Sequence, residues 1–206
     1  MTEKITESRN PVGPDHYAAL GEKNTRICWW MLALGLVFIV LPAYAIIYWE
    51  LNTADFFVSV WILDNCARCE IRYLDLQTYD GRSGWVYLYV MPLFFFLTLW
   101  GTLRLISVYF SEWRTERRYV ALVSPKLSVI AGFAVFGAFC IYVMAFINPE
   151  LSTSRYRGAA IMLSGWLYPL LGTGSVIVVS ACVTIFTVFV VKASLQRGRL
   201  YTARRG

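Results

Sequence analysis

This sequence predicts an all-α integral membrane protein. The predicted fold is a bundle of four transmembrane helices with the N- and C-termini in the cytoplasm. Three observations predict it. The chain is 58% hydrophobic and only 16% charged, whereas a typical soluble domain has about 25% charged residues. Its apolar residues form four long blocks without alternation, which favours helices over the strands of a barrel. Its Lys and Arg residues are distributed unevenly between the polar segments.

A span needs about 20 apolar residues at about 1.5 Å of rise each. All four apolar blocks are long enough, and they cover residues 27–49, 85–110, 127–147 and 159–191. We therefore expect one membrane domain over residues 27–191. It would follow a flexible cytoplasmic arm over residues 1–26 and precede a basic cytoplasmic tail over residues 192–206.

The polar segments set the orientation. With four spans, residues 1–26, 111–126 and 192–206 lie on one side of the membrane, and they hold 13 Lys and Arg. Residues 50–84 and 148–158 lie on the other side and hold five. The positive-inside rule then places both termini in the cytoplasm. The basic charge is explained by topology, so we expect the lipid bilayer and no nucleic acid as a partner.

The first span, residues 27–49, has aromatic residues at both ends and Pro42 in its last third. Proline has no N–H, so it frees a backbone carbonyl inside the helix. We expect a neighbouring helix to provide the partner for that carbonyl.

The exterior loop, residues 50–84, holds six acids and three arginines. Within it, residues 56–63 are apolar but too short to span a bilayer. This stretch is predicted to be an interfacial helix or a strand that packs on the outer ends of the bundle.

The second span, residues 85–110, contains a membrane-embedded charge, Arg104. A charge at the centre of a bilayer indicates function, but near a helix end a long side chain can reach the headgroups. We favour this snorkelling interpretation.

The third and fourth spans contain small residues and helix breakers. Ala134, Gly137 and Ala138 are candidates for close helix packing in the third span. The fourth block, at 33 residues, contains Pro169, Gly172 and Gly174. It is either a long tilted helix or a helix broken over residues 169–174 as in transporters. We favour the tilt, because no internal repeat pairs this segment with another.

Cys66-Ala67-Arg68-Cys69 is the only local pattern to which a chemical mechanism attaches. Two thiols at this spacing can form a reactive disulfide, and the cation of Arg68 would lower a thiol pKa. On the exterior side a disulfide would persist. We interpret Cys66 and Cys69 as a structural disulfide, with catalytic redox chemistry as the alternative. The other cysteines, Cys28, Cys140 and Cys182, lie in spans and are expected to be small buried apolar residues.

Four spans and a CxxC at residues 66–69 resemble the DsbB-type quinone-coupled thiol oxidases. The resemblance implies thiol oxidation, but the chain departs from that pattern twice. Residues 148–158 hold no second cysteine pair, and about fifteen residues separate the CxxC from the second span. The order of Trp61 and two cysteines also resembles claudins, although the cysteines are too close together. We assign the chain to neither family.

No metal site or cofactor is predicted. A zinc site needs four ligands, and the only histidine, His16, would lie in the arm on the cytoplasmic side. No phosphate loop, dinucleotide fingerprint or hydrolase motif is present. Gly172-Thr173-Gly174-Ser175 resembles a phosphate loop only superficially, because it lies in an apolar block and lacks the following Lys.

Three functions remain open. We favour a small non-enzymatic subunit or accessory protein of a multi-protein assembly in the bacterial inner membrane, of the secretion, conjugation or exclusion type, with other membrane proteins as partners. The alternative is a membrane thiol–disulfide oxidoreductase that uses Cys66 and Cys69. The third is a small transporter or channel, which would depend on a break near Pro169. No small-molecule ligand is identified by the sequence.

Overall fold

The computed structural model describes residues 14–115, 127–145 and 167–203, and these ranges are 92% helical, without a strand. Three helical segments are long and apolar enough to cross a membrane: Gly21–Trp49, Gly81–Phe110 and Tyr168–Val191. A fourth apolar helix, Ile130–Ala145, is shorter. The long helices indicate a membrane protein, as the composition predicts.

The first long segment begins earlier than the sequence indicates. Helix α1 spans Pro14–Gly35 and continues through the π-helical turn η1, Leu36–Val40, into α2, Leu41–Trp49. Residues 14–26 are therefore helical rather than part of an irregular arm, and residues 1–13 lie outside the described ranges. Proline suits the first position of a helix because its missing N–H needs no partner there. Farther along, Arg26 pairs with Glu22 at 3.3 Å, one helical turn away.

Pro42 leaves the carbonyl of Phe38, four residues earlier, without its helical N–H donor. The Tyr89 hydroxyl on the next long helix donates to this oxygen at 2.9 Å. The π-helical turn lies directly before the proline. The expectation that a neighbouring helix satisfies the freed carbonyl is confirmed.

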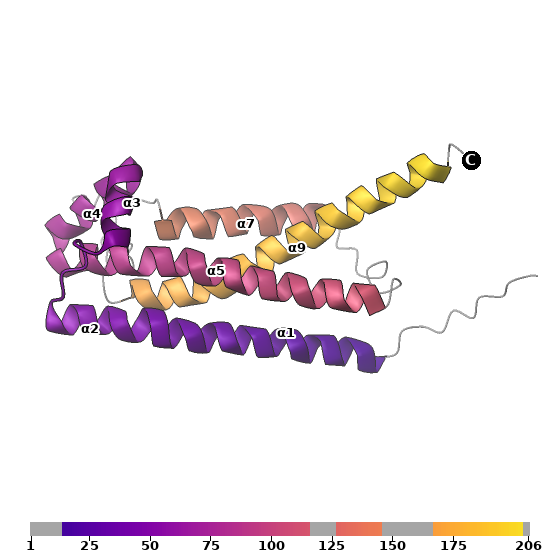
Figure 1. The fold of residues 1–206 in the computed structure, drawn as a ribbon, viewed down its shortest axis with the longest axis horizontal. Helices are drawn as coiled ribbons and strands as arrows, with labels where there is room; N and C mark the ends of the chain where they lie inside the picture. Colours follow the sequence, from indigo (N-terminus) through magenta and orange to yellow (C-terminus); the bar gives the residue numbers. More distant parts are fainter. Residues whose placement is uncertain (1–13, 116–126, 146–166, 204–206) are drawn as a thin grey trace, which may run out of the picture.

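Two short helices follow and lie at one end of the molecule (Figure 1). Helix α3 spans Phe57–Asn65 and α4 spans Ala67–Tyr79. The apolar stretch in the exterior loop is therefore a helix, and not a strand. We call α3 and α4 together the helical cap. The cap packs against the start of the next long helix, and α3 also packs against α4.

Helix α5 spans Gly81–Thr115, α7 spans Leu127–Ala145 and α9 spans Tyr168–Ala203. Helix α9 packs against α5, α7 and the first long segment (Figure 1). It is an unbroken helix in which Pro169 occupies the first turn. Residues 159–166 of the predicted fourth span lie outside the described ranges.

Small side chains allow the long helices to approach closely. A Cβ atom on Gly35 would overlap the Thr173 side chain, and one on Gly101 would overlap Met31. Between α5 and α9, the Ser180 hydroxyl donates to the backbone oxygen of Thr98 at 3.1 Å. Hydroxyl groups can therefore satisfy backbone oxygens across this interface, as is common between helices in membranes.

Candidate functional site

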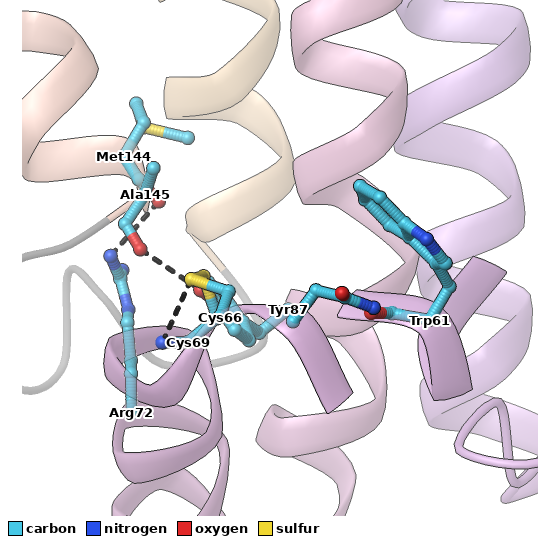
Figure 2. Close-up of a disulfide and its surroundings, with 8 residues drawn as sticks. Trp61, Cys66, Cys69, Arg72, Tyr87, Met144 and Ala145 are labelled. Atoms are coloured by element: carbon cyan, nitrogen blue, oxygen red, sulfur yellow. Dashed lines mark hydrogen bonds between the residues drawn. A yellow bond between two sulfur atoms is a disulfide. The ribbon is translucent and has the colours of Figure 1, made fainter. Parts of the chain in front are cut away.

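The cysteine pair of the sequence motif lies at the first turn of α4 and is at disulfide distance, with 2.02 Å between the two sulfur atoms. Cys66 is the residue before the helix, and its sulfur accepts the backbone N–H of Cys69 at 3.3 Å. That N–H is one of the first amides of a helix, which have no partner within the helix. The disulfide therefore closes and caps the first turn of α4 (Figure 2).

The two cysteines differ in accessibility. Cys66 is half-buried, whereas Cys69 is 0% exposed and belongs to the core. A thiolate from another protein could therefore approach the disulfide more easily at the sulfur of Cys66. A more accessible first cysteine before a buried second one allows exchange at one end of the pair.

Arg72 lies one turn after Cys69 and is buried, with 1% of its surface exposed. Its Nη1 atom donates to the backbone oxygens of Val143 at 3.0 Å and Met144 at 2.9 Å. These oxygens belong to the last turn of α7, where helical carbonyls lack partners. The negative end of the helix dipole also favours a cation there. Arg72 thus connects the helical cap to the end of α7 (Figure 2).

Two tyrosines complete this connection from two other helices. The Tyr87 hydroxyl, on α5, donates to the backbone oxygen of Ala145 at 2.9 Å, and the Tyr168 hydroxyl, on α9, donates to that of Met144 at 2.6 Å. The Cζ atom of Arg72 lies 4.8 Å from the ring centre of Tyr87 and 5.3 Å from that of Tyr168. Both distances are within the range of cation–π attraction.

We call Arg72, Tyr87 and Tyr168 the carbonyl clamp. The last three backbone oxygens of α7 accept hydrogen bonds from α4, α5 and α9 through these three side chains. One side of the clamp is incomplete, because Nε and Nη2 of Arg72 are buried and have no hydrogen-bond partner among the described residues. A buried donor without a partner costs about 1–3 kcal/mol.

Two further contacts join the segment that precedes the helical cap to α5. The Thr53 hydroxyl donates to the backbone oxygen of Trp85 at 2.7 Å, and Arg82 forms an ion pair with Glu50. Tyr73 on α4 packs near Gly84, where a Cβ atom would lie 3.0 Å from its ring. Burial raises the pKa of the Tyr73 hydroxyl above its ordinary value.

The other predicted residues lie away from the disulfide. Arg104 is exposed on α5, with its Cζ atom 5.7 Å from the ring centre of Trp100. On α7, Gly137 is buried, and a Cβ atom there would lie 3.0 Å from Cβ of Cys182. Ala134 is half-buried and Ala138 is exposed. The close approach of α7 to α9 therefore occurs at Gly137.

Cys28, Cys140 and Cys182 are free cysteines, the first two half-buried and the third buried. Among the described residues, no group of three or more His, Cys, Asp or Glu side chains is placed to hold a metal ion. His16 lies in α1.

The clamp is not evident from the sequence, in which Arg72 is one of the charges of a polar exterior loop. A signal was present, however. Cys69, Arg72 and Leu76 follow helical spacing, and all three are buried on one face of α4. A cation on the apolar stripe of a short helix indicates a buried partner. No protein-family model, curated protein or solved structure matches this chain.

Proposed function

We propose that the chain crosses the bacterial inner membrane four times, with α7 as the third span in chain order and both termini in the cytoplasm. Support comes from chain connectivity. Helix α5 runs away from the helical cap, whereas Tyr168 at the start of α9 lies next to Arg72 of the cap. The chain must return between them, and α7 runs in that direction (Figure 1). At 19 residues, α7 is about 28 Å long, close to the hydrocarbon thickness of about 30 Å.

In this arrangement the protein is a small non-enzymatic subunit of a multi-protein membrane assembly of the secretion, conjugation or exclusion type. The observation that carries the proposal is the exposed apolar face of α3. Phe57 is 84% exposed and Trp61 is 60% exposed, and Val58 and Val60 are exposed beside them. All four lie outside the candidate spans. An exposed apolar patch of this kind is typical of a contact surface.

Co-purification after gentle detergent extraction tests this proposal. We expect a defined set of membrane proteins to accompany the chain and to be lost from the double variant Phe57→Gln, Trp61→Gln. Leu74→Gln is the matched control, because Leu74 is also apolar and exposed in the helical cap. A monomer that retains no partner and shows enzymatic turnover would contradict the proposal.

A second candidate function is thiol–disulfide exchange at Cys66 and Cys69. It is favoured by the half-buried Cys66 beside the fully buried Cys69. In such an exchange, an incoming thiolate attacks the sulfur of Cys66, a mixed disulfide forms, and Cys69 leaves as a thiolate. Arg68 and the first turn of α4 would stabilise that negative charge.

The variant Cys69→Ser separates the two functions. In this variant no second thiol is present to resolve a mixed disulfide at Cys66. If the protein is an oxidoreductase, mixed disulfides between Cys66 and an exterior protein should therefore accumulate. Full biological function in Cys66→Ser would eliminate the catalytic role and leave the disulfide a structural one. The transporter alternative depended on a break in α9 near Pro169, and the continuous helix from Tyr168 gives it no support.

A further inference from the structure

The unpartnered side of Arg72 has a specific geometry. Nη1 is occupied by the two backbone oxygens of α7. Nε and Nη2, which remain free of partners among the described residues, form the side edge of the guanidinium group. On that edge two N–H bonds point in parallel and match two oxygens of one oxyanion. The remaining hydrogen-bonding capacity is therefore that of a bidentate oxyanion receptor.

The depth of this edge indicates which oxyanion is available. Tyr168 is the first residue of one candidate span, Ala145 is the last residue of the shorter apolar helix, and Tyr87 lies near the start of another span. The clamp therefore lies where apolar helices end and the helical cap begins. In a bilayer this is the depth of the lipid headgroups.

We infer that Arg72 binds a phosphate group through Nε and Nη2, with the rings of Tyr87 and Tyr168 beside the guanidinium plane. Two non-bridging oxygens of one phosphate accept the parallel N–H bonds. The phosphate belongs either to a phospholipid headgroup or to inorganic phosphate. Both nitrogen atoms are closed to water in this structure, so side chains around the edge move aside when the phosphate enters. This site is independent of the proposed subunit function.

Thermal unfolding of the full chain in a phosphate-free maltoside detergent tests the inference. Three additives are compared: short-chain phosphatidylglycerol, inorganic phosphate, and a short-chain diacylglycerol, which lacks the phosphate. A ligand at about 100 times its Kd should raise the Tm by roughly 5 °C. A rise with phosphatidylglycerol alone identifies the lipid as the source, and a rise with inorganic phosphate as well identifies the free ion. Equal effects of diacylglycerol, or no rise with either phosphate compound, would overturn the inference.

Arg72→Lys keeps the positive charge but lacks the parallel N–H pair, so most of the phosphate-dependent rise should disappear. Arg68→Lys is the matched control, because Arg68 is exposed on the same helix. The phosphate-dependent rise in Tm should persist in this variant. An unchanged rise in Arg72→Lys would contradict the site. If Arg72→Lys does not fold, native mass spectrometry of the delipidated wild-type chain decides, because one phospholipid or one phosphate per chain should bind again. Rebinding of neither would mean that only buried water occupies the edge.

Discussion

The long helices and the helical cap are held together by different means. The long helices contact one another over many turns, through apolar side chains and at small residues such as Gly35 and Gly137. The cap is short: it contributes only Ile62, Cys69 and Leu76 to the buried core of the described residues, and the hydrogen bonds of Arg72 add a polar attachment to α7. A distributed interface tolerates the loss of one contact, whereas an attachment made by few polar groups does not. Single substitutions should therefore act most strongly on the cap.

Arg72→Met is expected to have the largest effect. It removes two charge-assisted hydrogen bonds and leaves the Val143 oxygen without this donor, whereas the Met144 oxygen keeps the Tyr168 hydroxyl. The loss should be about 3 kcal/mol of unfolding free energy. Thermal or denaturant unfolding in detergent measures the loss. Arg68→Met, at an exposed position on the same helix, should change stability by less than about 0.5 kcal/mol. Similar losses for the two variants would mean that Arg72 does not hold the cap.

Reduction of Cys66–Cys69 should cost about 2 kcal/mol, the chain-entropy estimate for so short a loop. The loss should be local, because the disulfide closes only the first turn of α4. Hydrogen exchange should become faster in α3 and α4 after reduction and stay unchanged in α5 and α9. A double variant, Cys66→Ser with Cys69→Ser, should no longer respond to the reductant. Faster exchange throughout the long helices would contradict the separation between the cap and the rest of the molecule.

Gly35→Ala tests the distributed interface itself. The added Cβ atom would overlap the Thr173 side chain of α9, and such overpacking should cost about 1.5 kcal/mol. Gly132→Ala is the matched control, because a Cβ atom there has no neighbour within 4 Å. That variant should gain up to about 1 kcal/mol from helix propensity. Comparison of the two Tm values measures the contact, and equal values would mean that α1 does not approach α9 at Gly35.

Tyr89→Phe should have the smallest effect. It removes the hydroxyl that donates to the Phe38 carbonyl before Pro42. A hydrogen bond between membrane helices contributes about 0.6 kcal/mol on average. Tyr142→Phe, at an exposed position on α7, serves as the reference in the same unfolding assay. A loss much larger than that of Gly35→Ala would mean that the helix around Pro42 depends on this one hydrogen bond.

The sequence was sufficient to predict features that depend on local composition. Apolar length predicted the long helices, and the absent N–H of Pro42 predicted an external partner for its freed carbonyl. The spacing of Cys66 and Cys69 predicted the disulfide pair. Each of these expectations follows from residues that are neighbours along the chain, or from the requirement that backbone polar groups inside a membrane have hydrogen-bond partners.

Features that depend on distant segments were missed. Arg72 lies in a predicted exterior loop that holds six acids, and the carbonyls that it contacts when buried are 71 and 72 residues away. The helical start at Pro14 was missed because polar residues conceal a helix that extends beyond its apolar part. Pro169 suggested a break inside a span, yet it lies in the first turn of α9, where proline is well tolerated.

The capping of α7 by side chains from α4, α5 and α9 has a consequence for biogenesis. In the proposed four-span arrangement, a nascent chain would insert α7 before all the donors for its final turn exist, because Tyr168 is translated after α7. Until α9 arrives, that turn presents polar backbone atoms at the edge of the lipid. We expect chains truncated before residue 168 to be short-lived in cells, because membrane proteases can recognise such an unfinished helix end.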